Sequence, residues 1–96
     1  MTSVIWSIPA LESRNTIIRY ISRDSPEAAI ALDNEFSKAI ERIAMFPQSG
    51  RLGRVEGTKE VVVRSNYVLV YEQRNEDIVV LIVLHTAQQY PPEDIG

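Results

Sequence analysis

The sequence has no cysteine among its 96 residues and only one histidine, His85. Disulfide bonds and thiolate metal sites are therefore excluded. A single imidazole also argues against a catalytic zinc centre, so we expect neither a metal nor a cofactor. No apolar run approaches the roughly 18 residues of a membrane-spanning helix, and the first residues lack a charged segment before an apolar core. We therefore expect a cytoplasmic protein with no signal peptide and no membrane span.

A dominant charge of one sign is also missing, because 10 basic residues stand against 13 acidic ones and the net charge is −3. This balance gives no global signal for nucleic-acid binding. The charges are unevenly spread, however. Residues 51–64 hold four basic and two acidic groups, whereas residues 65–96 hold one basic and five acidic groups. The segment 51–64 is thus a local positive region, which is either solvated surface or a site for a polyanion at the edge of a small sheet.

Length and composition predict a single domain over residues 1–96. Hydrophobic residues make up 45 % of the chain, and the sequence has neither a low-complexity tract nor an internal repeat. These features are typical of an ordinary globular domain with one core. The polar end of the chain, from about residue 91 to residue 96, predicts a flexible C-terminal tail.

The first half of the chain predicts a strand and two helices. A short strand over residues 3–7 comes first, and a helix over about 10–23 follows it. The pair Ser25-Pro26 is typical of a helix start, because serine caps the end and proline suits the first turn. Apolar side chains then recur at spacings of three and four, which predicts a second helix over about 26–46.

The second half predicts a glycine-containing loop over 47–57 and then three strands. Their expected ranges are 59–64, 67–73 and 78–85, with Ser65-Asn66 as a two-residue turn between the first two. The last strand is apolar almost throughout, so it should be central and buried on both faces. The predicted order is β-α-α-β-β-β. This is an α+β fold in which a two-helix hairpin packs on a small, mainly antiparallel sheet.

Four sequence features occur together in this chain, and their combination is specific. They are the early Trp6 strand, the helix break Asp24–Ala29, the loop Phe46–Arg51 with its continuation through Gly53-Arg54-Val55 and Gly57–Glu60, and the closing segment Leu84–Pro91. With these features in this order and at this length, the chain resembles toxins of the RelE/ParE superfamily, from bacterial type II toxin–antitoxin modules. The resemblance covers nearly the whole chain.

The resemblance implies a growth-arresting toxin with a cognate antitoxin as its partner, and it leaves two activities open. RelE-like members cleave mRNA in the ribosomal decoding site, whereas ParE-like members lack that chemistry and poison DNA gyrase. Our leading interpretation of the sequence is a metal-independent endoribonuclease that acts on mRNA at the ribosome, with a non-enzymatic gyrase poison as the alternative. The acidic net charge and the absence of a basic cluster after the last strand count against RNA cleavage.

Two residues are expected to carry the chemistry if the protein cleaves RNA. In RelE-like nucleases an arginine at the matching place contacts the scissile phosphate, and the resemblance gives this role to Arg64. His85 is the side chain that changes charge most easily near neutral pH, and we assign it proton transfer. The alternatives are an arginine solvated at a turn and a histidine that bonds to the main chain at the end of a strand.

Other residues of the second half are expected to bind the substrate. Three cations could hold flanking phosphates: Arg51, Arg54 and Lys59. Tyr90 could stack on a base, and so could Tyr71, although Tyr71 is better explained as core. Glu56 and Glu60 could act as bases, but Glu60 is expected to pair with a nearby cation. Simple solvation remains the alternative for the loop cations.

Overall fold

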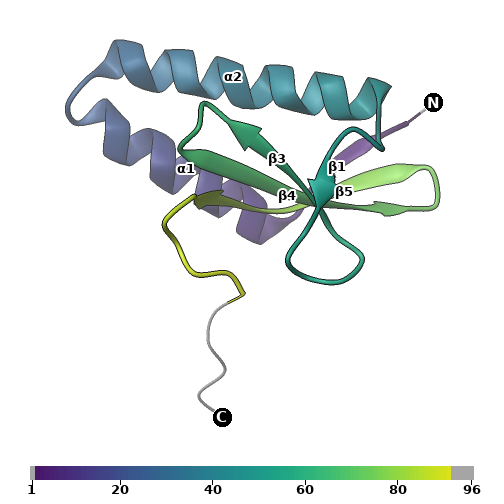
Figure 1. Ribbon diagram of the computed structural model, residues 1–96. Helices are drawn as coiled ribbons and strands as arrows, with labels where there is room; N and C mark the ends of the chain where they lie inside the picture. The colour runs from purple at the N-terminus through teal and green to yellow at the C-terminus, as the bar shows by residue number, and fades with distance from the viewer. Residues whose placement is uncertain (1, 92–96) are drawn as a thin grey trace.

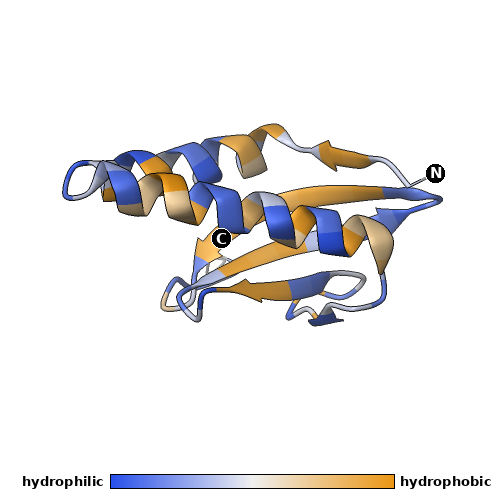
Figure 2. Ribbon diagram, turned by 90° about the horizontal axis from the view of Figure 1, so that it is seen from above, coloured by the Kyte–Doolittle hydropathy of each residue, from blue (hydrophilic) through white to orange (hydrophobic). Residues whose placement is uncertain are grey.

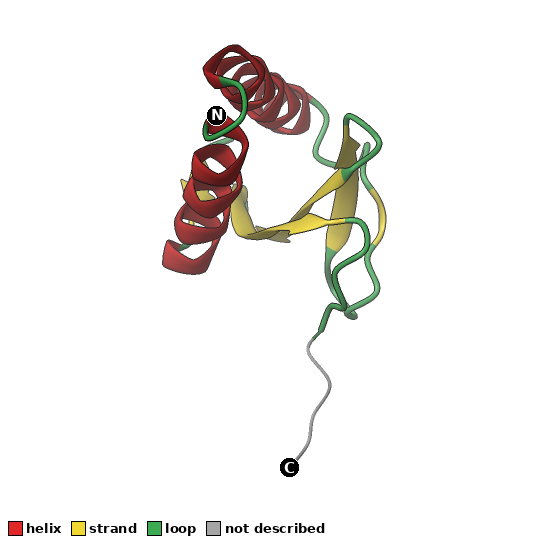
Figure 3. Cartoon of the chain, turned by 90° about the vertical axis from the view of Figure 1, so that its left-hand side faces the viewer, coloured by secondary structure: helices red, strands yellow, loops and turns green. Residues whose placement is uncertain are grey.

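The computed structural model describes residues 2–91, and residues 92–96 of the expected tail lie outside them. Seven elements follow one another along the chain (Figure 1): β1 Val4–Trp6, α1 Ile8–Ser22, α2 Pro26–Met45, β2 Arg51–Leu52, β3 Lys59–Val63, β4 Tyr67–Arg74 and β5 Asp77–His85. The two helices lie together on one side of a strongly twisted sheet (Figure 3). The predicted α+β class and the helical hairpin on a sheet are confirmed. None of the helices among the described residues is long and apolar enough to cross a membrane.

Both helices begin at a serine. The side chains of Ser7 and Ser25 each accept a hydrogen bond from the main-chain N–H three residues further on, which satisfies one of the free donors of the first turn. Each helix also has a proline in its first turn, where the missing N–H costs nothing. The helix α1 therefore begins at Ile8, two residues before the expected start, because the cap at Ser7 sets its first residue.

The sheet has the strand order β1-β5-β4-β3-β2. The first strand pairs with β5 in parallel, with Val4 opposite Ile78, and all the other pairs are antiparallel. The apolar strand β5 lies between β1 and β4 and is largely buried, as the sequence predicts. The middle strand of the sheet is nevertheless β4, because β1 and β2 flank the expected three-strand meander.

The main core lies between the helical hairpin and the sheet. Figure 2 shows helices with alternating polar and apolar faces over strands that are apolar along much of their length. The buried members of this core come from both layers: Ala10, Leu32, Phe36 and Ala39 from the helices, and Val63, Leu69, Val80 and Val83 from the strands. Burial of the apolar stripes at spacings of three and four therefore fixes the helices on this face.

A smaller cluster covers the other face of the sheet. Val68, Val70 and Leu84 are buried there without any helix residue, and Tyr90 packs against them from beyond the end of β5. Glu60 is directly opposite Val70 in the β3–β4 pair, so its side chain also belongs to this face. The chain after β5 thus partly covers the face that the helices leave free.

Two details of the meander differ from the sequence prediction. The strand β2 falls inside the expected loop, because two residues between glycines are too short to give a hydrophobic pattern. The turn between β3 and β4 spans residues 64–66 rather than Ser65-Asn66. Arg64 and Ser65 have φ values of 58° and 63°, so the positive φ angles of a tight hairpin fall one residue earlier than expected. The strand β3 consequently ends at Val63 instead of Arg64.

Candidate functional site

The turn after β3 and the end of β5 lie at the same end of the sheet. Tyr67, the first residue of β4, is directly opposite His85. The N–H of Thr86 donates to the carbonyl of Asn66 at 2.7 Å, which joins the turn to the chain beyond β5. Arg64 is exposed in the same turn. The structure therefore brings the two expected catalytic residues to one end of the sheet, and their roles stay predictions.

The ring of His85 is held on both sides. Its Nδ1 atom accepts a hydrogen bond from the N–H of Ala87 at 3.0 Å, and its ring meets Tyr67 edge-on at 5.5 Å between centroids. Because Nδ1 accepts, the neutral ring carries its proton on Nε2. Nδ1 can therefore serve as a proton acceptor only after this hydrogen bond breaks. The sequence left two roles open for His85, proton transfer or a hydrogen bond to the main chain at the end of a strand. The bond to Ala87 corresponds to the second role.

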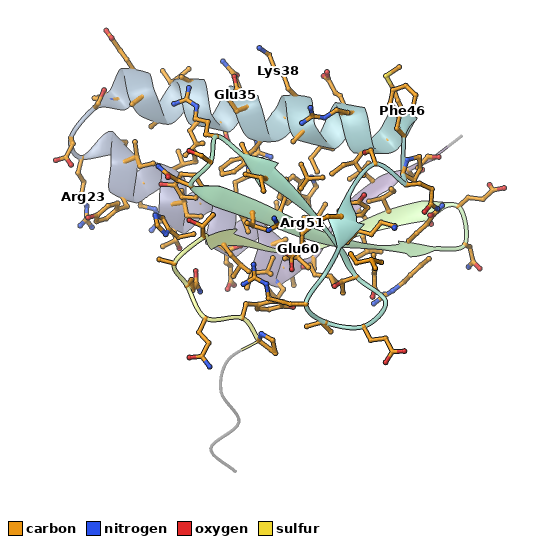
Figure 4. All side chains as sticks on the ribbon, viewed as in Figure 1. Arg23, Glu35, Lys38, Phe46, Arg51 and Glu60 are labelled. Carbon is orange, nitrogen blue, oxygen red and sulfur yellow. The ribbon has the colours of Figure 1, made fainter. Side chains whose placement is uncertain are left out.

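A buried carboxylate organises the loop between β2 and β3. Glu60 Oε2 accepts the main-chain N–H of Arg54 at 3.1 Å and its Nε at 3.0 Å. Glu60 Oε1 accepts from Nη2 of Arg54 and from Nη2 of Arg51, both at 3.2 Å. Figure 4 shows Arg51 and Glu60 side by side. The expected pairing of Glu60 is confirmed, and two of the expected phosphate-binding cations are ion-paired within the protein.

The protonation of Glu60 reflects this environment. Desolvation of the buried side chain raises its pKa, but the hydrogen bonds from the main chain and side chain of Arg54 and from Arg51 lower it by more. The pKa of Glu60 therefore lies below its usual value of 4.5, and the group is a carboxylate at neutral pH. A carboxylate with a lowered pKa that accepts four hydrogen bonds is suited to hold a loop and unsuited to act as a general base.

The expected site residues are divided between the two faces of the sheet. His85 is on the helical side, because its partner Tyr67 contacts Phe36. Glu60, and with it the paired Arg54, is on the other side, where Tyr90 also packs. Lys59 begins β3 and Arg64 follows its last residue, so the two are roughly 16 Å apart at about 3.3 Å per residue. No single cluster therefore contains all the expected residues.

Tyr71 is part of the core, as expected. Its side chain is fully buried, and its hydroxyl donates to the carbonyl of Pro47 at 2.9 Å and accepts from the N–H of Gly50 at 3.0 Å. Desolvation raises the pKa of this phenol above its usual 10.0, so it remains protonated and can keep donating. Tyr71 thereby ties the loop after α2 to β4. Glu56 is exposed in the loop after β2.

A groove between α2 and the outer edge of β3 contains residues that the sequence did not single out. Two adjoining hollows share Arg42 and Val62. The first is also lined by Glu35, Lys38 and Arg64. The sequence does carry a signal for this surface, because Lys38 and Arg42 are four residues apart and so lie on one face of the helix. Only the fold places that face beside β3.

Comparisons with known proteins agree on the family and the fold. The profile of the ParE toxin of the type II toxin–antitoxin system parDE matches residues 4–90. The Y4kP protein of Sinorhizobium fredii (strain NBRC 101917 / NGR234) is 33 % identical over 86 residues, which are 90 % of each chain. Toxin RelE2 of Caulobacter vibrioides (strain ATCC 19089 / CIP 103742 / CB 15) is 30 % identical over 88 residues, or 92 % of this chain and 99 % of that protein. A solved structure of the chromosomal ParDE system from P. aeruginosa has the same fold, with a TM-score of 0.76 at 17 % identity over 88 % of this chain and 96 % of that one.

Proposed function

The chain belongs to the ParE toxin family of type II toxin–antitoxin systems, and on that premise we propose that it arrests bacterial growth by binding DNA gyrase rather than by cleaving RNA. Its family implies a cognate antitoxin as partner. Gyrase poisoning is the activity of ParE-like members of the superfamily and requires no catalytic group in the toxin. The proposed place of action is the cytoplasm, where both candidate targets are found.

The division of the candidate residues between two faces of the sheet is the observation that carries this proposal. RNA cleavage without a metal needs a base, an acid and cations around one phosphate. Here Glu60 neutralises Arg51 and Arg54 on one face, and His85 on the other face has Nδ1 bonded to Ala87. A toxin that acts by binding needs no such convergence.

Ribosome-dependent mRNA cleavage is the second candidate. Arg64 and His85 come to the same end of the sheet, and one relative carries the name Toxin RelE2. In this alternative Arg64 holds the phosphate and His85 moves a proton after its bond to Ala87 breaks. Arg51, Arg54 and Lys59 position the RNA, and Tyr90 stacks on a base.

The two candidates are separated by the first macromolecule that is damaged after induction. Wild-type protein and the double variant Arg64→Ala/His85→Ala are expressed in a strain without antitoxin, and DNA breaks and mRNA integrity are followed over time. We expect DNA breaks first, equal toxicity of both proteins and protection by a resistant gyrase allele. If mRNA is cleaved early and only the wild type causes this cleavage, the target is the ribosome and not gyrase.

A further inference from the structure

One face of α1 carries four polar or aromatic side chains around a hollow of about 150 Å³. These residues follow one another at spacings of three and four and are all exposed: Thr16, Arg19, Tyr20 and Arg23. Such spacings place side chains on one face of a helix. Arg23 follows the last residue of α1 but keeps right-handed helical dihedral angles, so it continues this face at the end of the hairpin (Figure 4). We call the four residues the α1 surface.

The packing of the protein does not account for the α1 surface. The helix contributes other residues to the core: Ala10, Ile17, Ile18 and Ile21. Arg14 connects the helix to α2, because its Nε donates to Asp33 at 2.8 Å. The α1 surface takes no part in these contacts, and Tyr20 is 68 % exposed. A large exposed aromatic residue between two arginines is typical of a binding surface.

The two arginines of the α1 surface have no salt bridge within the described part of the chain. Carboxylates bind other arginines there: Arg14, Arg51, Arg54 and Arg74. The acids nearest in sequence to Arg19 and Arg23, which are Glu12 and Asp24, do not line the hollow. The helix dipole favours cations in a last turn, but it does not explain the tyrosine and the threonine beside them. The α1 surface is therefore a positive patch suited to an anionic partner.

Every side chain of the α1 surface is of a type that contacts nucleic-acid backbones. Arginine, threonine and tyrosine donate hydrogen bonds to phosphate oxygens, and these contacts carry no information on base sequence. Arg19 and Arg23 are one helical turn apart, or about 6 Å along the axis. A DNA strand carries one phosphate per about 3.4 Å of its axis, so both arginines can each meet a phosphate of the same strand.

We propose that the α1 surface binds the backbone of the duplex DNA that gyrase holds, through Arg19, Arg23 and the hydroxyl groups of Thr16 and Tyr20. This inference rests on the proposed function and adds a DNA contact to it. Two cations on a protein of net charge −3 give little affinity for DNA alone. A toxin already bound to gyrase is held beside that DNA, so the contact forms at a high effective concentration.

A DNA backbone suits the α1 surface better than other anionic partners. The surface extends over seven residues from Thr16 to Arg23, about 10 Å along the helix, so a single small anion cannot reach all four side chains. A row of phosphates offers acceptors along this whole length. A second copy of this chain would bring the same two arginines against Arg19 and Arg23, and like charges oppose such pairing.

The affinity of the toxin for gyrase, measured with and without a bound DNA duplex at several salt concentrations, tests the proposal. Arg19→Gln/Arg23→Gln should bind gyrase with DNA about tenfold more weakly than the wild type does. The slope of log affinity against log salt concentration should flatten by about 1.8, because each lost phosphate contact removes about 0.9. Binding to gyrase without DNA should not change. Both positions are exposed and glutamine favours helices, so the variant should fold.

Two matched variants control for charge and for position. Arg19→Lys/Arg23→Lys keeps both positive charges, so it should retain most of the salt slope that the glutamine variant loses. Arg74→Gln removes an exposed arginine at the end of β4 that Glu72 already pairs with. It should alter neither the affinity for gyrase with DNA nor the salt slope. A loss with Arg74→Gln equal to that of Arg19→Gln/Arg23→Gln would mean that only net charge matters, which overturns the site.

The results also distinguish this inference from the proposed function. If Arg19→Gln/Arg23→Gln binds gyrase with DNA like the wild type and with the same salt slope, the α1 surface does not contact DNA and the proposal is wrong, while gyrase remains the target. Equal losses with and without DNA would mean that the surface contacts protein, which also overturns the proposal. Unchanged binding to gyrase with DNA but weaker binding to ribosomes would assign the surface to RNA instead. No binding of the wild type to gyrase in either state would refute the proposed function, and this inference with it.

Discussion

The buried carboxylate of Glu60 holds Arg54 by both its main chain and its guanidinium group. The contacts measure 3.1 Å to the main-chain N–H and 3.0 Å to Nε, and the Glu60 side chain is only 2 % exposed. A single residue therefore fixes the conformation of the loop between β2 and β3 and neutralises a cation that the sequence assigned to RNA. The contact that stabilises the loop thus also occupies an arginine that RNA cleavage would need, which supports the proposal that the protein acts without catalysis.

Glu60→Gln should lower the free energy of unfolding by about 1–3 kcal/mol. Glutamine retains the shape and one acceptor oxygen, but its NH2 group cannot accept from the donors of Arg54, and the charge-assisted bonds are lost. Urea unfolding measures the change. Glu56→Gln in the same loop is the control, because Glu56 is exposed, and it should shift stability by no more than about 0.5 kcal/mol.

The stabilisation by Glu60 should depend on pH. Its pKa in the folded protein is lowered from 4.5, so the contribution is fully present above that value and is lost as the pH falls through the folded pKa. Unfolding of the wild type and of Glu60→Gln is compared from about pH 7 to about pH 3, a range that spans the usual pKa of 4.5. We expect the difference in unfolding free energy to shrink below about pH 4.5. A difference that is constant with pH would contradict the assigned role of the carboxylate.

Tyr71→Phe should destabilise the protein by about 1–3 kcal/mol, because the carbonyl of Pro47 and the N–H of Gly50 both lose their partner at a buried site. Thermal unfolding is the measurement. Tyr20→Phe offers a matched control, since Tyr20 is 68 % exposed. Equal melting temperatures of the two variants would show that the buried hydroxyl does not tie the loop to β4.

Ser13→Ala tests the protected edge of β5. Loss of the hydroxyl leaves the N–H of Val83 without its acceptor, and we expect a loss of about 1–2 kcal/mol in unfolding free energy. Faster amide exchange at Val83 should accompany it. Alanine is otherwise favourable within α1, so a variant as stable as the wild type would mean that the edge does not need this bond.

The sequence predicts the elements whose signals are local. Serine caps and prolines mark the helix starts, and the apolar run before His85 identifies an interior strand. The short β2 carries no such pattern, and the positive φ angles at Arg64 and Ser65 fall on residues without a local preference for them. These features depend on how the strands of the meander pack together. The residues next to them in the sequence do not predict that packing.

The candidate site was less accessible to sequence reasoning. Clustering along the chain suggested that Arg51, Arg54, Arg64 and His85 share one site. The sheet instead divides them into two pairs, with Arg51 and Arg54 on Glu60 near the start of β3 and with Arg64 and His85 at its other end, because the ends of β3 are far apart. Lys38 and Arg42 were missed for the same reason, since only the tertiary fold brings α2 beside the edge of β3.

Incubation of purified toxin with DNA gyrase and supercoiled plasmid, followed by detection of cleaved DNA held on the enzyme, is the most direct test of the proposed function. The account predicts gyrase-dependent DNA cleavage complexes with the wild type and, to the same extent, with Arg64→Ala/His85→Ala. Added antitoxin should abolish them. Absence of cleaved DNA at excess toxin, together with mRNA cleavage on translating ribosomes that the double variant cannot perform, would contradict it.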